Sequence, residues 1–415
     1  MAWGTVKVLR DRNARIYLGG VIVSGFGNTA MSLAAGIWIK TLTGSNSLAA
    51  LVACCAWLPS LAGPAIGTLA DRVRRRPLLV LTNLVLAVVM TAPLAVRSGG
   101  TVWVLFVVLT LVGAGSVLTD AAETALMAAA VPERLRGDFN GLVRTAIESM
   151  KLLAPPAGAG LFAALGGPSV ALLDAITFAL AGVAFALLRI TEITEATEIT
   201  EAEKTREPVA DGPMETPPGR AAWWTETAAG IRFLCGHPLL RGLVLAAGAA
   251  MVASSLSSTA TFAMLDAGLH RSPAFAGVLT PLQGLGSVVA GLAAGSLLRR
   301  VPERAFVAAG LLLFALGVLA RATPFLPVVL VGQLAVGLGL PCPLIAAMTA
   351  VQRETPPEFL GRVAATASTM MFAPTGLALL VGSGLVAGFD YRVQLVAAAA
   401  LGLSAAAGLL RGSAR

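Results

Sequence analysis

The sequence predicts an all-α membrane protein with twelve transmembrane helices arranged as two six-helix bundles. Three observations predict this fold class. Apolar residues make up 56% of the 415 residues and charged residues only 13%, against about 25% charged in an average soluble domain. Twelve apolar stretches are long enough to cross a bilayer, which takes about 20 residues per helix. Lys and Arg are concentrated in alternate connections between these stretches, as they are when those loops face the cytoplasm.

The expected spans form two sets of six. They cover residues 16–39, 46–70, 77–97, 101–128, 139–165 and 168–189 in the first half, and 239–265, 273–298, 304–322, 324–350, 360–386 and 390–411 in the second. Residues 1–15 and 412–415 are expected to be cytoplasmic tails on either side of bundles 16–189 and 239–411. Residues 67–73 resemble 295–301, and 131–135 resemble 356–360, at nearly the same offset. These two similarities support an internal repeat of one half in the other.

Residues 190–238 separate the two halves. This segment begins with glutamates at every third position from Glu192 to Glu201 and continues with four prolines. Low complexity, acidity and proline predict a solvated linker. The aromatic and apolar pattern of residues 223–234 predicts a short helix, either at the cytoplasmic membrane interface or packed on the helices.

The distribution of basic residues predicts the sidedness. Loops expected inside contain clusters such as Arg74 to Arg76, whereas loops expected outside contain mostly single charges such as Lys40. Both termini are therefore expected in the cytoplasm. The composition, rich in Ala, Gly and Arg, indicates a bacterium, with the chain in its cytoplasmic membrane. The net charge of +8 follows from these loop residues, so nucleic acid is not expected as a partner.

The four cysteines show no spacing typical of a metal site or a disulfide framework. The sequence also lacks a catalytic constellation and a phosphate-binding Gly-rich loop. We therefore expect no enzyme activity, no metal and no cofactor.

The connection after the second span reads GTLADRVRRR from Gly67 to Arg76. It resembles the G-x-x-x-D-R-x-G-R-R loop of the major facilitator superfamily, with Arg74 in place of the second glycine. An anion at the membrane edge can pair with a basic residue or with the N-terminus of a helix in one conformation only. The resemblance thus implies a conformational latch in a twelve-helix transporter, and its residues are Gly67, Asp71, Arg72, Arg75 and Arg76. The alternative is that the arginines act only as topogenic charges.

A second resemblance lies in the fifth span, which reads APPAGAG from residue 154. It is similar to the G-P-x-x-G element of drug:proton antiporters in that superfamily, carried here by Pro155, Pro156 and Gly158. The motifs LTGS at 42–45 and LDAITF at 173–178 are similar to the efflux branch of siderophore and macrolide exporters. Members of this branch often have an acidic residue where this chain has Asn28.

Ionisable residues inside a bilayer usually face a cavity and have a function. Five of them fall at similar depth in the fourth and fifth spans: Asp120, Glu123, Arg144, Glu148 and Lys151. We expect a charge cluster in which Asp120, Glu123 or Glu148 carries a proton beside Lys151 or Arg144. A static pair that only joins the two helices is the alternative. Asp174 in the sixth span is a weaker candidate for the proton carrier and is expected close to the outer surface, because its helix begins shortly before, at Pro168.

Few ionisable residues occur in the second half between its helix ends. A cavity lined by aromatic, methionine and amide side chains suits an apolar or amphipathic solute. The candidates are Phe26, Asn28, Met31, Phe262, Gln283, Gln333, Met370 and Phe372. The sequence therefore predicts a monomeric, proton-coupled exporter of a hydrophobic small molecule. A siderophore, metabolite or lysolipid transporter, or a scaffold or sensor without transport, are the alternatives.

Overall fold

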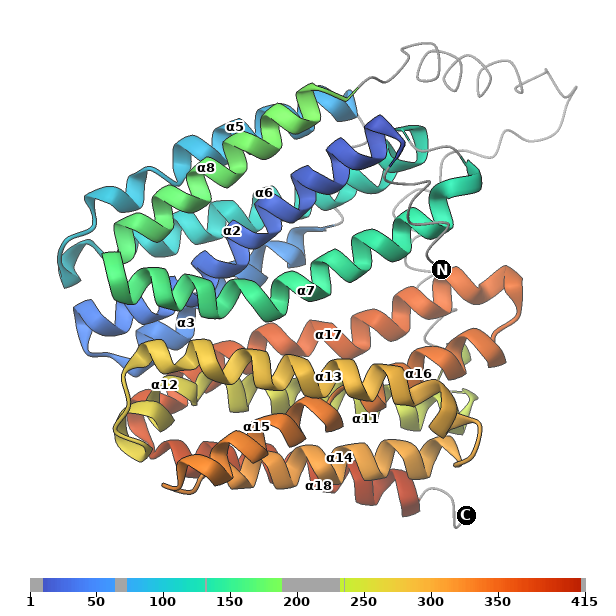
Figure 1. The fold of residues 1–415 in the computed structure, drawn as a ribbon. Coiled ribbons are helices and arrows are strands. Elements are labelled where there is room, and N and C mark those ends of the chain that lie inside the picture. The colour runs from blue at the N-terminus through green and yellow to red at the C-terminus, as the bar shows by residue number, and fades with distance from the viewer. Residues whose placement is uncertain (1–9, 64–72, 131–132, 189–231, 235, 412–415) are drawn as a thin grey trace, which may run out of the picture.

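The computed structural model describes residues 10–63, 73–130, 133–188, 232–234 and 236–411. The described residues form helices and short connections, without a strand. The helices lie roughly parallel in two bundles, one from each half of the chain (Figure 1). The prediction of an all-α, two-bundle membrane protein is confirmed.

The described part of the N-terminal bundle contains six main helical segments. They are α2 (Arg12–Thr43), α3 (Asn46–Trp57) with its extension η1 (Leu58–Ala62), α5 (Arg75–Val89), α6 (Trp103–Ala130), α7 (Glu133–Leu165) and α8 (Gly167–Ala186). The short turns η2 (Ala92–Ala95) and η3 (Gly99–Thr101) connect α5 to α6. Helix α2 packs against α7 and α8, and α5 packs against α6 and α8. Asp11 caps the start of α2, and Gly44 ends it in the left-handed conformation that glycine adopts without strain.

The C-terminal bundle repeats this plan with more interruptions. Its elements are α11 (Pro238–Thr259), α12 (Thr261–Ala263), η4 (Met264–Gly268), η5 (Pro273–Phe275), α13 (Ala276–Leu298), α14 (Glu303–Ala320), α15 (Leu326–Gly339), α16 (Pro341–Glu354), α17 (Pro357–Gly388) and α18 (Tyr391–Arg411). Helix α11 packs against α17 and α18, α14 against α15 and α18, and α13 against α15. Leu234, just before this bundle, is 1% exposed and belongs to its core, so the end of the expected linker helix packs on the bundle.

Ten described segments have the length and composition of a membrane span. The apolar segment 46–62 occupies the expected second position, and α7 the expected fifth. Helix α7 begins at Glu133, six residues before the span expected from 139. Hydrophobicity marks only the part of a helix inside the bilayer, whereas charged residues with good helix propensity extend the helix beyond it. Pro155 and Pro156 lie inside α7 without ending it.

Glycines set the closest helix contacts. A Cβ atom on Gly286 of α13 would meet the Leu334 carbonyl oxygen of α15, and one on Gly158 of α7 would lie 2.6 Å from the Ala30 carbonyl oxygen of α2. Such approach of two backbones is how helices associate in lipid, where apolar side chains gain little by leaving the bilayer.

We call the end of the bundles that contains Gly44 and Gly166 the outer end, and the end that contains Arg75 and Arg353 the inner end, following the topology that the sequence predicts. The latch residues Gly67, Asp71 and Arg72 lie outside the described residues. Arg75 begins α5, and the guanidinium of Arg76 donates a hydrogen bond to the Ala186 carbonyl at the inner end of α8.

Candidate functional site

An ion pair joins the two bundles at the outer end. The ammonium of Lys40, in the last turn of α2, lies 2.5 Å from Asp266 Oδ2 in η4. The same ammonium donates to the Gly44 carbonyl oxygen at 2.7 Å. Asp266 sits on a π-helical turn, a local insertion that is common at functional positions in helices. The turn therefore places a carboxylate of one bundle over the helix end of the other.

Further polar contacts surround this ion pair. The Ser47 hydroxyl of α3 donates to the Ser383 carbonyl oxygen of α17 at 2.5 Å, and the Asn46 amide donates to Asp266 at 3.4 Å. We call Lys40, Asn46, Ser47, Asp266 and Ser383 the outer gate. All of these contacts cross from one bundle to the other, so they must break if the outer ends separate.

Apolar contacts continue the interface inward from the outer gate. Phe262 of α12 packs against α2 where Gly36 leaves room for its ring. Phe262 also contacts the cores of both bundles. Trp57 packs against Gly376 of α17, and Ala159 of α7 packs against Gly277 of α13. The two bundles thus contact each other through three pairs of helices: α2 with α12, α3 with α17, and α7 with α13.

A tyrosine and two carboxylates form a polar group between α2 and α6. The Tyr17 hydroxyl donates to Glu123 Oε2 at 3.2 Å. The Tyr17 ring is 3% exposed and packs edge-on against Phe139 and Phe185. Asp120 lies three residues before Glu123 on α6 and is exposed, so both carboxylates share one helix face. Two carboxylates this close, with a hydroxyl donor to one of them, form a site that can bind and release a proton.

Glu148 and Lys151 form a separate pair on α7. The Lys151 ammonium lies 3.1 Å from Glu148 Oε1, and both side chains are about half exposed. They line a cavity of about 560 Å³ between α7 and α13, together with Leu152, Thr280, Gln283, Gly284, Ser287, Val288, Gly291 and Leu292. The expected single charge cluster is therefore divided: Asp120 and Glu123 lie at the α2 interface, and Glu148 and Lys151 line the α13 cavity. Arg144 belongs to α7, but its side chain lies outside the described residues.

The expected substrate-contacting residues fall into three environments. Gln283 lines the α7–α13 cavity and accepts a hydrogen bond at 2.9 Å from Gln333, which is 5% exposed within the C-terminal bundle. Phe262 closes the outer interface. Met31 is 1% exposed in the N-terminal core, so it packs between helices, and it does not line the α7–α13 cavity. The others lie on the spans expected: Phe26, Asn28 and Met370 are half-buried and Phe372 is 43% exposed.

Several polar residues were not expected in these roles. The sequence predicted only a topogenic charge at Lys40 and no role for Tyr17. Asp174 is not near the outer surface as expected: it is 1% exposed, about a third of the way along α8. Arg321 is 3% exposed and donates to the hydroxyls of Ser257 at 2.6 Å and Thr261 at 2.9 Å. An isolated charged residue near the end of an apolar segment was the available signal for Lys40 and Arg321.

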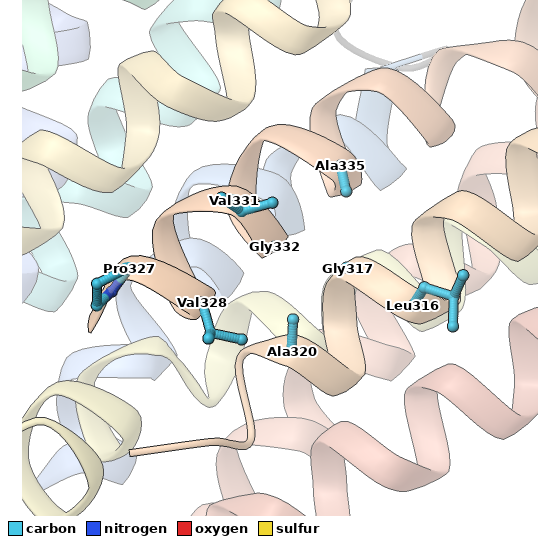
Figure 2. Close-up of a pocket in the computed structure, with 8 residues that line it drawn as sticks. All are labelled: Leu316, Gly317, Ala320, Pro327, Val328, Val331, Gly332 and Ala335. Carbon is cyan, nitrogen blue, oxygen red and sulfur yellow. The ribbon is translucent and has the colours of Figure 1, made fainter. Parts of the chain in front are cut away.

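An apolar groove of about 380 Å³ lies between α14 and α15 (Figure 2). Gly317 and Gly332 bring the two helices close together. Its other lining residues are Leu316, Ala320, Pro327, Val328, Val331 and Ala335. Val331 is 68% exposed and Leu316 is 54% exposed, as expected of side chains that face lipid. The groove has no polar side chain with which to orient a substrate, so we do not assign it to transport.

Among the described residues, no group of three or more His, Cys, Asp and Glu side chains is placed to hold a metal ion.

Comparison with known proteins identifies the family. The sequence profile of the Major Facilitator Superfamily matches residues 17–269 and 243–414. The chain therefore belongs to the major facilitator superfamily and is a multi-pass membrane transporter of small molecules, not an enzyme. No curated protein sequence matches it significantly.

Solved structures share the fold at low sequence identity. A bacterial homologue of the iron transporter ferroportin, in an inward-facing state, has a TM-score of 0.71 at 15% identity, covering 97% of this chain and 99% of its own. A bacterial homologue of the human lysosomal transporter Spinster, inward-facing and occupied, has a TM-score of 0.67 at 15% identity, with 97% and 96% covered. A mutant of the peptide transporter POT in complex with sulfate has a TM-score of 0.68 at 18% identity, with 98% and 95% covered. At these identities the likeness concerns the fold alone.

Proposed function

We propose that the protein is a proton-driven exporter of a hydrophobic or amphipathic, drug-like small molecule, working as a monomer in a bacterial cytoplasmic membrane. In this proposal both termini are cytoplasmic, and residues 16–189 and 239–411 move as two units joined by the linker 190–238. The outer gate is the observation that carries the proposal. Its contacts hold the outer ends together in this structure and must break in any state open to the outside.

The outer gate makes two states physically distinct. With Lys40 bound to Asp266, the inner end is the side from which a solute enters between the bundles. When the bundles rock, this ion pair is lost and other contacts at the inner end replace it, which is the two-state element that alternating access requires. We assign the loop 67–76 the role of that inner contact. The hydrogen bond from Arg76 to Ala186 supports the proposal by anchoring the start of α5 next to this loop.

Glu123 and Asp120 are the proposed proton carriers. Glu123 accepts from Tyr17 across the α2–α6 interface, so a change in its protonation alters a contact between two helices of the N-terminal bundle. Asp120 is exposed on the same helix. A proton taken from the outside and released inside can thereby favour one packing of the helices over the other, which is the coupling that antiport needs.

The α7–α13 cavity supports an amphipathic substrate. Its lining contains the polar side chains of Glu148, Lys151, Thr280, Gln283 and Ser287 and the apolar side chains of Leu152, Val288 and Leu292. A solute with an apolar body and a polar or charged group can contact both kinds of side chain. A siderophore, metabolite or lysolipid with the same division of polarity is the alternative substrate, and a scaffold or sensor without transport is the alternative role.

The test is substrate-dependent proton movement. The full-length protein is reconstituted into liposomes that contain a pH-sensitive dye, and lipophilic cations, macrolides and siderophores are added in turn. We expect at least one compound to move protons in wild type and Glu123→Gln to abolish that movement. The matched control is Glu354→Gln, which removes a carboxylate at the inner end of α16 and should leave the movement intact. Proton movement that persists in Glu123→Gln and in Asp120→Asn would contradict the assignment of the carriers. A wild type that moves no proton with any compound would contradict the exporter.

A further inference from the structure

Besides the carboxyl groups of Glu123 and Asp120, the N-terminal bundle contains a further carboxyl group, which is buried. Asp174 of α8 is 1% exposed. Its Oδ1 lies 3.2 Å from the Thr177 hydroxyl oxygen, and this hydroxyl donates to the Asp174 backbone carbonyl oxygen at 2.8 Å. Its Oδ2 has no hydrogen-bond partner within the described part of the chain. A buried polar atom without a partner destabilises the folded state, so this position is not explained by its contribution to packing.

The backbone of α2 covers this carboxyl group directly. A Cβ atom on Gly27 would lie 2.5 Å from Asp174 Oδ1 and would overlap the Thr177 hydroxyl. The carboxyl group therefore fits only because residue 27 has no side chain. The side chains of Asp174 and Thr177 contact the α2 backbone directly at Gly27. Any movement of α2 along or away from α8 therefore changes the surroundings of Asp174.

Among the side chains that the structure describes, no cation of the neighbouring helices is placed to neutralise an ionised Asp174. Helices α2, α5 and α7 and the turn η2 pack against α8. On α2, the nearest titratable residues are Tyr17 and Lys40, ten and thirteen positions from Gly27, or roughly 15 and 20 Å along the axis. Arg75 and Arg76 lie at the inner end of α5, Glu148 and Lys151 line the α13 cavity, and η2 has no titratable residue.

An isolated carboxylate in such an apolar site is costly enough that the group takes up a proton instead. As a neutral acid, Asp174 can carry its proton on Oδ1 and donate it to the Thr177 hydroxyl oxygen at 3.2 Å, because the Thr177 hydroxyl itself donates to the Asp174 backbone carbonyl oxygen. The proton can leave only to water, and water can reach the group only when α2 uncovers it.

We propose that the carboxyl group of Asp174, covered by α2 at Gly27, is a second proton-binding site of this transporter, which loads and releases its proton as α2 moves against α8. The inference rests on the proposed function, because it assigns a further site to the same proton-driven cycle. The step is Asp174–COOH to Asp174–COO⁻ plus H⁺, with the proton passing to water in the opened state.

Infrared difference spectroscopy tests this site without any substrate. The full-length protein in lipid nanodiscs is taken from acidic to alkaline pH, and the C=O band of protonated carboxyl groups is recorded. We expect a band that is present at neutral pH, decreases reversibly at higher pH, is lost in Asp174→Asn and persists in Glu123→Gln. Thr177→Val removes the hydroxyl group next to the carboxyl group with little change of shape, so it should shift the position of the same band without removing it.

Two results would overturn the proposal. One is a titrating band that survives in Asp174→Asn or, where that variant does not fold, a band unshifted in Thr177→Val. The other is an Asp174 band that stays constant over the whole pH range in which the protein remains folded, because this describes a static acid. Failure of the proposed function is a separate outcome: liposomes would show no substrate-dependent proton movement while the Asp174 band still titrated.

Discussion

Removal of the charge on Asp266 should open the outer end. The substitution Asp266→Asn keeps the size of the side chain and eliminates the ion pair with Lys40 at 2.5 Å. A hydrogen bond to a charged group contributes about 1.5–3 kcal/mol. That energy is present only while the outer ends are closed, so its loss shifts the ratio of closed to open molecules by roughly 10- to 140-fold. Because the Asp266 side chain is 53% exposed, screening by water and salt reduces the contribution to about 1 kcal/mol and the expected shift to about fivefold.

Spin labels on Arg97 and Arg271 can measure the shift. Both residues are exposed at the outer end, one in each bundle, and pulsed dipolar spectroscopy gives the distribution of distances between them. We expect a short distance in wild type and a second, longer distance in Asp266→Asn. Asp390→Asn is the matched control, because that exposed carboxylate accepts from the Arg392 backbone N–H within its own turn. An unchanged distribution in Asp266→Asn, or an equal change in Asp390→Asn, would refute the reasoning.

Three further predictions concern single contacts. Gly158→Ala should lower the apparent melting temperature in detergent, because the new Cβ would lie 2.6 Å from the Ala30 carbonyl oxygen and overpacking costs about 1–3 kcal/mol. Gly160→Ala is the matched control: it has open space around it and should raise the melting temperature slightly, because alanine is the better helix former. Gln333→Leu should weaken binding of a transported compound several-fold in equilibrium dialysis, because Gln283 loses its donor at 2.9 Å, and unchanged affinity would remove Gln283 from the substrate site. Arg353→Ala should change the melting temperature little, because its pairs with Glu303 and Glu354 lie at a half-exposed arginine and such pairs contribute about 0–1 kcal/mol; a large loss would show that they hold α14 and α16 together.

The sequence predicted the helices better than the contacts between them. Apolar length and charge placement were sufficient to locate spans such as 273–298, because the bilayer requires a minimum number of apolar residues whatever the tertiary structure. The start of α7 at Glu133 was missed because helix propensity continues where hydrophobicity stops. These are local properties of the chain, so a single sequence contains them.

The pairing of polar side chains depends on how helices are rotated and shifted against one another. Glu148 was correctly expected to pair with Lys151, since residues three apart share a helix face. The contacts Tyr17–Glu123 and Lys40–Asp266 join residues that are 106 and 226 positions apart in the sequence. Nothing in the local spacing of residues indicates these contacts. Asp174 was misplaced for the same reason: its burial results from Gly27, a residue on another helix.

Uphill movement of a substrate shows most directly whether a proton gradient drives transport by this protein. Liposomes containing the protein are given a pH difference with the membrane potential clamped at zero, and the distribution of a lipophilic cation or of another compound that moves protons is measured at steady state. We expect accumulation on the acidic side, by up to about tenfold per pH unit for exchange of one proton. This accumulation should reverse when the gradient is reversed and be lost in Glu123→Gln. A compound that reaches equal concentrations on both sides with and without the gradient would show a facilitator, and would contradict proton-driven export.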